Sequence, residues 1–161
     1  MYATRVSRRV QAPPHAVYRA LTDADAIAAW RVPAGMTAHV HTFEAREGGT
    51  FRVSLTYDDA SATGKSGGHT DTYSGRFARL VPDALVVEVF DFETEDDAVR
   101  GTMTMTTTLT AAAGGTDVEI VHEGIPDDIP REDNERGTRM ALDNLARLVE
   151  GPHALRSPEA E

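Results

Sequence analysis

The stretch that decides the fold reads Glu132-Asp-Asn-Glu-Arg-Gly-Thr-Arg-Met-Ala-Leu-Asp-Asn-Leu-Ala-Arg-Leu-Val-Glu150. At about 100° per residue, one stripe of this stretch collects its apolar and small side chains, namely Asn134, Thr138, Ala141, Leu142, Leu145, Leu148 and Val149. Pro130 suits a first helical turn, and the acidic residues after it complement the positive end of the helix dipole. Gly151-Pro152 would end the helix. The pattern predicts one long amphipathic helix over residues 132–150.

Nearly everything before this helix has the pattern of β-strands. Alternating and β-branched runs predict strands over residues 2–11, 36–46, 50–57, 69–80, 85–92, 102–110 and 116–123. The pair Gly48-Gly49 predicts a hairpin turn. Two short helices, 15–21 and 24–30, follow the first strand, and Asp23 is expected to cap the second. Because helices and strands are segregated along the chain, we expect an α+β fold, an antiparallel sheet of six or seven strands with the long helix lying on it.

Composition narrows the classes of function. The chain has 161 residues, which favours one domain over residues 1–151 followed by a flexible tail over 152–161. A formal net charge of −10 argues against nucleic-acid partners and anionic membranes, since both require a basic surface. The chain contains no cysteine, which excludes disulfides and thiolate metal sites. With no apolar run of signal-peptide or membrane-spanning length, we expect a cytoplasmic protein that does not insert into membranes.

Several short motifs, in order, resemble one known superfamily. They comprise 12–23 (APPHAVYRALTD) followed by Trp30, 43–51 (FEAREGGTF), 75–77 (GRF), 114–116 (GGT) and 142–148 (LDNLARL). Together they resemble the helix-grip superfamily of START-like (SRPBCC) proteins. Within it, the chain is most similar to the bacterial single-domain branch related to the C-terminal domain of the activator of heat-shock-protein-90 ATPase. The resemblance covers about residues 3–150 and implies a strongly curved antiparallel sheet gripping the C-terminal helix, with a cavity between them.

The resemblance implies a kind of site more than a reaction, since one fold hosts many functions. The superfamily includes small-molecule binders and cyclases, and this branch has no shared catalytic motif to carry over. One position departs from the family pattern. Relatives often have an aromatic residue, usually tryptophan, directly after the glycine that corresponds to Gly137, whereas this chain has Thr138.

The stripe of the long helix is uneven, and this unevenness locates the expected cavity. Its second half is bulky, whereas Asn134, Gly137, Thr138 and Ala141 in the first half are small or polar. The first half should therefore leave space over the sheet. The residues we expect to line a ligand site there are Trp30, Phe51, Tyr73, Phe90, Met103, Met105, His122, Thr138 and Ala141, with Phe43 and Phe92 as further aromatic candidates. The alternative is that the same residues simply fill a core.

His122 is the candidate polar group of this site. Val118, Ile120 and His122 share one face of the last predicted strand, so a core-facing Val118 and Ile120 bring His122 inward as well. A partly buried imidazole can act as a general acid or base or as a hydrogen-bond partner for a ligand. The expected alternative is a histidine tied to the backbone at the end of a strand, since interior polar groups are commonly satisfied within the protein. Asp71 and Tyr73 share a face of their strand, and Arg76 takes the other.

Other motifs carry less weight. His39 and His41 point the same way from one strand, but no third ligand has a fixed spacing to them. Thr63-Gly64-Lys65-Ser66 lacks the earlier glycine of a phosphate-binding loop, because that position is Asp59. We therefore predict neither a metal nor any other cofactor.

Three hypotheses follow. The first is a binding protein for a small apolar or amphipathic molecule held under the C-terminal helix. The second is an enzyme of the cyclase, aromatase or hydrolase kind that uses His122 or Tyr73 in the same cavity. The third is a chaperone-activator-like module for protein partners, which predicts a contiguous exposed apolar patch. Met140, the large apolar residue off the helix stripe, is compatible with such a contact or with a homodimer.

Overall fold

The computed structural model describes residues 1–58 and 70–150. Within these ranges the elements are β1 (Tyr2–Val10), α1 (Pro14–Leu21), α2 (Ala24–Trp30), β2 (Met36–Phe43), β3 (Thr50–Tyr57), β4 (Thr70–Val81), β5 (Leu85–Phe92), β6 (Met103–Ala112), β7 (Gly115–Ile125) and α3 (Arg131–Glu150). Almost all of the loop predicted over 58–68, including the stretch 63–66, lies outside the described residues, as does the predicted tail over 152–161.

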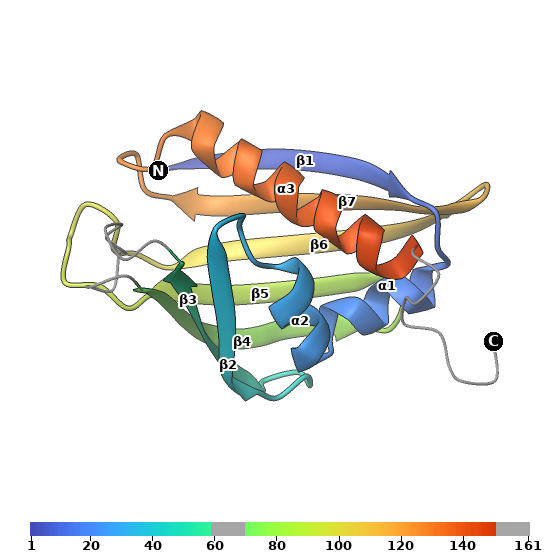
Figure 1. Cartoon of the computed structure of the whole chain (residues 1–161), viewed down its shortest axis with the longest axis horizontal. Helices are drawn as coiled ribbons and strands as arrows, with labels where there is room; N and C mark the ends of the chain where they lie inside the picture. The colour runs from blue at the N-terminus through green and yellow to red at the C-terminus, as the bar shows by residue number, and fades with distance from the viewer. Residues whose placement is uncertain (59–69, 151–161) are drawn as a thin grey trace.

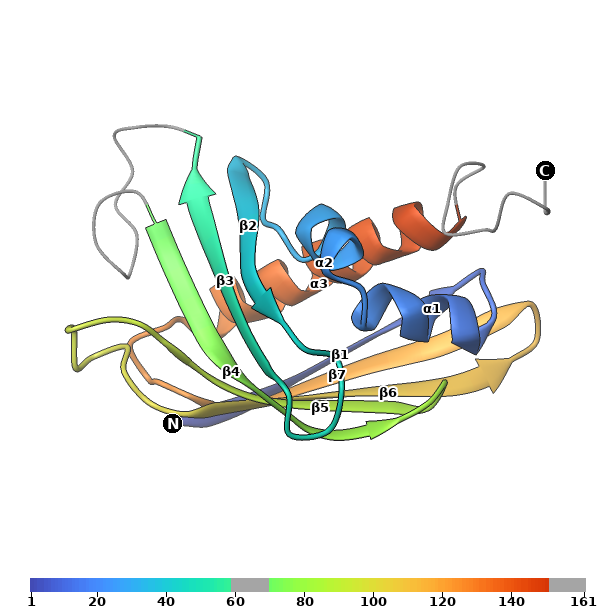
Figure 2. The ribbon, with the colours of Figure 1, turned by 90° about the horizontal axis from the view of Figure 1, so that it is seen from below.

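The strands form one antiparallel sheet in the order β1-β7-β6-β5-β4-β3-β2. Its two edges, β1 and β2, are consecutive strands in the chain, so α1 and α2 carry the chain from one edge to the other. All three helices lie on the same side of the sheet, with α3 running across it (Figure 1). Figure 2 shows β2 and β3 rising steeply beside the helices, out of the plane of β1, β7, β6 and β5. The predicted α+β helix-grip architecture is therefore confirmed.

Turn chemistry explains where the observed elements begin and end. The strand expected over 36–46 stops at Phe43, because Glu44 to Gly49 form a turn in which Gly49 N donates to Arg46 O at 2.8 Å. Gly48 has a φ of +80°, which glycine adopts at little cost. The expected cap of α2 is present, since Asp23 Oδ1 accepts from Ala26 N at 3.0 Å.

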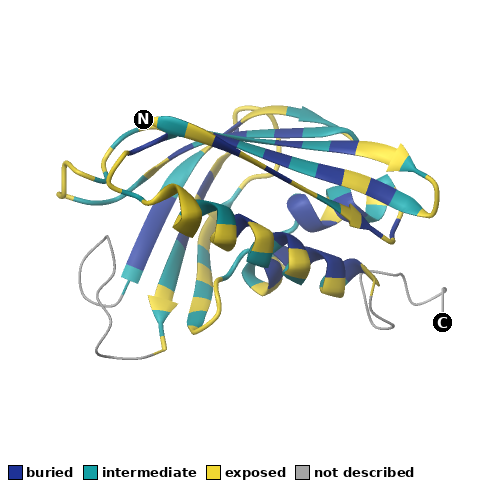
Figure 3. Cartoon of the chain, turned by 90° about the horizontal axis from the view of Figure 1, so that it is seen from above, coloured by how far each residue is buried: buried dark blue, intermediate teal, exposed yellow. Residues whose placement is uncertain are grey.

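Helix α3 packs against the sheet through its second half. Leu142, Leu145, Ala146 and Val149 are buried at the spacing of one helical stripe. Ala146 is buried, whereas Leu148, which was expected on the buried stripe, is only half-buried. Figure 3 shows the resulting pattern, with buried and exposed residues alternating along the strands and the outer face of α3 exposed.

Helices α1 and α2 also contribute buried side chains to the core. Val17 and Leu21 of α1 and Ile27 and Trp30 of α2 are all buried. Trp30 Nε1 donates to Ala20 O at 2.8 Å, so the one polar atom of this buried ring is satisfied within the protein. No helix within residues 1–58 and 70–150 is both long enough and apolar enough to cross a bilayer.

Candidate functional site

A cavity of about 460 Å³ lies between the first half of α3 and the concave face of the sheet. Its inner end is formed by buried side chains from six elements, namely Trp30, Tyr73, Phe90, Met103, Ile120, His122 and Thr138. Exposed residues, among them Pro33, Asp128, Pro130 and Asp133, lie at its entrance. The volume is within the usual range for small-molecule sites, roughly 300–1,000 Å³.

The cavity exists because the first half of α3 carries small side chains. A methyl group added at Gly137 would meet no heavy atom within 4 Å, so no neighbour requires a glycine there. Thr138 Oγ1 donates to Asn134 O at 2.9 Å, which turns its hydroxyl back onto the helix. Ala141, the next residue on this face, is half-buried. No large side chain of α3 therefore reaches across to the sheet until Leu142.

Eight of the nine residues predicted for a ligand site lie around this cavity, and Phe51 does not. Phe51 is opposite Gly75 in the register of β3 and β4. Its ring packs edge-on against Phe77 at 5.2 Å and Tyr73 at 6.1 Å between centroids, so it lies in the core behind Tyr73. Phe43 also packs on Phe77, whereas Phe92 lines the cavity.

His122 is held by a hydrogen-bonded chain that links three elements. Thr4 Oγ1 of β1 donates to Asn134 Oδ1 of α3 at 2.6 Å. Asn134 Nδ2 in turn lies 3.0 Å from His122 Nδ1 of β7. With the amide oriented by Thr4, Nδ2 donates and Nδ1 accepts, so the imidazole proton is on Nε2. Nε2 is buried without a partner, and the expectation that His122 is tied to the backbone is wrong.

Burial keeps His122 neutral. The side chain is 7% exposed and its ring lies 5.6 Å from that of Phe90. Desolvation, followed by the nearby positive charge of Arg31, lowers the pKa of His122 from 6.5 to about 4. At neutral pH the His122 side chain, which lines the cavity, is therefore an uncharged imidazole whose Nε2–H is a donor.

Arg31 and Glu88 form a buried ion pair beside the cavity. Arg31 follows directly after α2, and its Nη1 and Nη2 donate to Glu88 Oε1 and Oε2 of β5 at 2.6 and 3.1 Å. The side chains are 15% and 3% exposed. The guanidinium also lies 4.8 Å from the Trp30 ring centroid. The two charges cancel, so the pair places no net charge beside the cavity.

Tyr73 adds a second uncharged polar group. Its hydroxyl is buried, and the nearby Arg31 guanidinium interacts with the hydroxyl oxygen, which leaves the O–H group as a donor without an acceptor. Burial raises the pKa of Tyr73 to about 12, and the opposing effect of Arg31 is smaller. Tyr73 and His122 pack on the same neighbour, since the Phe90 ring lies 5.8 Å from that of Tyr73.

Sheet register explains why these groups meet. Thr4, His122, Met105 and Glu88 are paired in turn across β1, β7, β6 and β5, so they form one row on the concave face. Asn134 and Arg31 approach this row from α3 and α2.

The polar residues Arg31, Glu88 and Asn134 were absent from the predicted ligand-site set, and Phe92 was only a further candidate. Glu88 had a usable signal, because an acidic residue stands at an inward position of the apolar run 85–90. Asn134 was on the predicted inner stripe. Arg31 was assigned to a loop, and no local pattern connects it with a residue 57 positions later.

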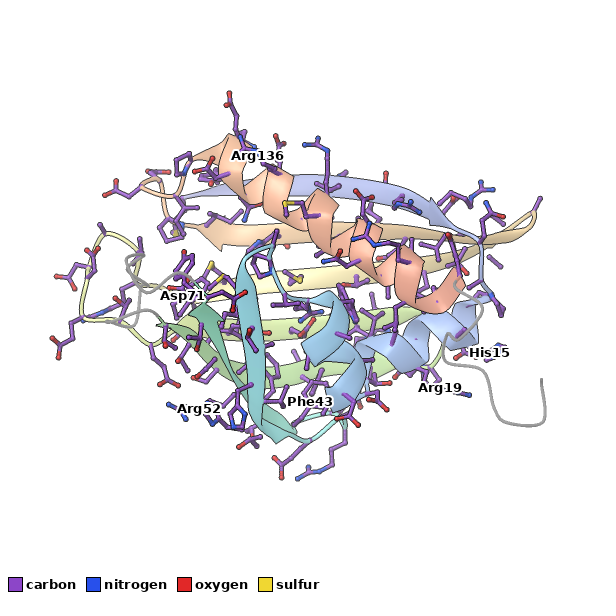
Figure 4. All side chains as sticks on the ribbon, in the orientation of Figure 1. His15, Arg19, Phe43, Arg52, Asp71 and Arg136 are labelled. Carbon is purple, nitrogen blue, oxygen red and sulfur yellow. The ribbon has the colours of Figure 1, made fainter. Side chains whose placement is uncertain are left out.

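The other candidates lie apart from the cavity. His39 and His41 are exposed, with ring centroids 4.5 Å apart, and His41 Nε2 shares a hydrogen bond with Ser54 Oγ. Asp71 is buried on β4, outside the cavity lining, and Arg76 is exposed. The residues labelled in Figure 4, including Asp71 on β4 and Arg52 on β3, belong to other parts of the surface and core. Within the described ranges, no three His, Cys, Asp or Glu side chains come together as a metal site would require.

Met140 lines a second, more open hollow on the outside of the molecule. This hollow of about 650 Å³ lies between the 32–36 segment and the second half of α3. Its other lining residues include Met36, Asn144 and Arg147. It shares Val32 and Pro33 with the cavity but none of the buried polar groups.

Comparison with known proteins places this fold in a family. Residues 11–150 match the model of the family described as Activator of Hsp90 ATPase homolog 1-like protein. A solved structure from Chromobacterium violaceum is 35% identical, with a TM-score of 0.82, covering 93% of this chain and 99% of that one. A second structure, from Rhodobacter sphaeroides, is 19% identical, with a TM-score of 0.77 and coverages of 94% and 95%.

A third structure, an AHSA1-like protein from Aeromonas hydrophila, is 20% identical, with a TM-score of 0.70 and coverages of 96% and 99%. The last two show the fold alone. No functionally curated protein matches the chain. Such a fold supports a ligand-binding or interaction module in general terms. The match over 140 residues and the 35% identical structure establish that the chain belongs to the Activator of Hsp90 ATPase homolog 1-like family.

Proposed function

We propose that this protein reversibly binds a small apolar or amphipathic molecule in the cavity beneath the first half of α3. The proposal rests on the open volume of the cavity. Apolar walls from β4 to β7 face a helix segment with small side chains, and at Gly137 an added methyl group would meet no neighbouring atom. A protein interior is normally close-packed. We therefore interpret the open volume of about 460 Å³ as space for a bound ligand.

The protonation states favour binding over proton-transfer catalysis. A general base needs an accessible lone pair, but the lone pair of His122 is on Nδ1 and is taken up by Asn134. Tyr73, with a pKa of about 12, stays a neutral phenol at pH 7. Among the described lining residues, the carboxylates are Asp128 and Asp133, both exposed at the entrance. The inner end therefore offers donors rather than a base.

The surface gives little support to a protein-docking function. That hypothesis predicts a contiguous exposed apolar patch. Within residues 1–58 and 70–150, Met1 is the large hydrophobic residue that is exposed. The internal cavity is therefore the better candidate for a site of recognition.

Binding can be tested with N-phenyl-1-naphthylamine, an uncharged dye whose fluorescence rises in apolar surroundings. The test variant is Thr138→Trp, which puts a large ring into the cavity from a position that is 9% exposed. The matched control is Arg139→Trp, which adds the same ring on the exposed face of α3. We expect saturable binding to the wild type and to Arg139→Trp, and loss of at least about tenfold in affinity for Thr138→Trp.

Circular dichroism and thermal unfolding establish that both variants are folded. Equal dye binding by a folded Thr138→Trp variant would contradict the proposed location. Absence of saturable binding to the wild type, for this dye and for the naphthalene compounds below, would contradict the proposed function.

A further inference from the structure

We infer that the cavity selects an uncharged aromatic or otherwise apolar molecule bearing a hydrogen-bond-accepting oxygen, such as a ketone or ester carbonyl, and discriminates against carboxylates. This inference rests on the proposed binding function and specifies the ligand class. It is carried by two buried donors without partners, an internally neutralised ion pair and an acidic entrance.

Two buried hydrogen-bond donors belong to residues that line the cavity. His122 Nε2 and Tyr73 Oη are two of the three buried side-chain polar atoms without a partner in the described residues. The third, Thr107 Oγ1, does not line the cavity. Burying a polar atom without a partner is unfavourable, so such atoms are uncommon unless something outside the chain satisfies them. Here both residues line one cavity, and both flank the Phe90 ring.

The hydrogen-bonding character of the site follows from the tautomer. Because Asn134 donates to His122 Nδ1, Nε2 can only donate. A ligand that satisfies it must present an acceptor. A hydroxyl can also accept, but an oxygen held between Nε2–H and the Tyr73 hydroxyl is best satisfied when it accepts from both, as a carbonyl oxygen does.

Charge decides between a carbonyl and a carboxylate. The positive charge nearest the two donors is that of Arg31, and Glu88 already neutralises it through two hydrogen bonds. An anion at this position would lose its hydration without gaining an unpaired cation, which is strongly unfavourable in a buried site. Asp128 and Asp133 at the entrance would also repel an anion on its way in.

The aromatic side chains of the cavity wall favour a ligand in which the accepting oxygen is attached to a flat apolar group. Phe90 and Phe92 lie edge to face at 6.5 Å between centroids, and Tyr73 packs edge-on against both. Met103 and Met105 complete this side, and methionine adapts its shape to aromatic surfaces. These rings suit an aromatic ligand better than a flexible chain.

Three naphthalenes that share one ring system test the inference. 2-Acetylnaphthalene carries an uncharged acceptor, 2-naphthoate a charged one, and 2-ethylnaphthalene none. Displacement of N-phenyl-1-naphthylamine, or calorimetry, gives the three dissociation constants at pH 7. We expect the ketone to bind about 2- to 10-fold more tightly than the ethyl compound, the range for one net hydrogen bond. We expect the carboxylate to bind more weakly than the ketone by at least about tenfold.

Two variants assign this preference to the named groups. His122→Phe removes the donor and keeps a ring, so the ratio of the dissociation constants of the ethyl compound and the ketone should fall to about one. Glu88→Gln leaves Arg31 unpaired beside the cavity, so the carboxylate should gain affinity relative to the ketone. If Glu88→Gln does not fold, the His122→Phe comparison still decides the donor's role.

The outcomes separate the two proposals. If the three naphthalenes bind the wild type equally, or the carboxylate binds most tightly, the inferred ligand class is wrong while the binding function stands. An unchanged ketone preference in His122→Phe would also overturn it. If none of the three binds and the dye does not bind, the binding function itself fails.

Discussion

Asn134 and His122 lie 3.0 Å apart, Nδ2 to Nδ1, and this contact joins the first half of α3 to β7. Thr4 fixes the orientation of the amide from the other side. The contact does two things. It fixes the position of the first half of α3 relative to β7. It also places the imidazole proton of His122 on Nε2.

The first prediction concerns this contact. Asn134→Leu leaves His122 Nδ1 and the Thr4 hydroxyl without their partner, so the free energy of unfolding should fall by about 1–3 kcal/mol. Nitrogen NMR of the imidazole should show one tautomer, protonated at Nε2, in the wild type and a mixture in the variant. Arg136→Leu is the matched control, since Arg136 projects from α3 into solvent (Figure 4). A wild-type imidazole protonated at Nδ1 would contradict the assignment.

The second prediction is a pH dependence of stability. The pKa of His122 is about 4 in the folded protein and near 6.5 when unfolded. Between these values the unfolded chain binds more protons, so stability is fully present above pH 6.5 and falls as the pH drops toward 4. The loss should reach roughly 3 kcal/mol at full separation of the two values. Urea unfolding at several pH values measures it, and His122→Phe should lack this component. An identical pH dependence in wild type and variant would contradict the prediction.

The third prediction separates the two halves of α3. Leu145 is fully buried, so Leu145→Ala should lower the free energy of unfolding by about 2–5 kcal/mol. Thr138→Ala removes a side chain that already borders open space, so it should cost less than about 1 kcal/mol. Chemical denaturation of both variants gives the comparison. Equal losses would mean that the first half of the helix is packed as tightly as the second.

The fourth prediction compares two glycines. Gly137→Ala meets no neighbouring atom within 4 Å and improves helix propensity, so the variant should be more stable by about 0.5–1 kcal/mol. Gly75→Ala should be destabilised by about 2–3 kcal/mol, because its methyl group would lie 2.0 Å from Val89 O. Thermal unfolding of the pair measures both signs. A destabilised Gly137→Ala would indicate that the space beneath it is not free.

The sequence was sufficient to predict the fold and most of the cavity. The spacing of Leu142, Leu145 and Val149 identified the packed half of the helix, and the small residues before them identified the open half. Those patterns are local and periodic, so they can be read along the chain. His122 could be placed inward for the same reason, from its alternation with Val118 and Ile120.

The polar contacts could not be predicted in this way. The partners Arg31 and Glu88 come from a helix end and a central strand, 57 positions apart, and they meet only in the folded chain. The role of Asn134 depends on Thr4, which is 130 positions earlier. Phe51 was misplaced because alternation gives the face of a strand but not which part of that face borders the cavity.

The most direct test of the proposed binding site uses the five methionines as reporters. Met103 and Met105 line the cavity, Met36 and Met140 line the outer hollow, and Met1 is exposed at the N-terminus. A titration of methyl-labelled protein with 2-acetylnaphthalene should shift the signals of Met103 and Met105, saturably and together, and leave those of Met36 and Met140 in place. Shifts confined to Met36 and Met140, or no saturable shift at Met103 and Met105, would contradict a ligand site beneath the first half of α3.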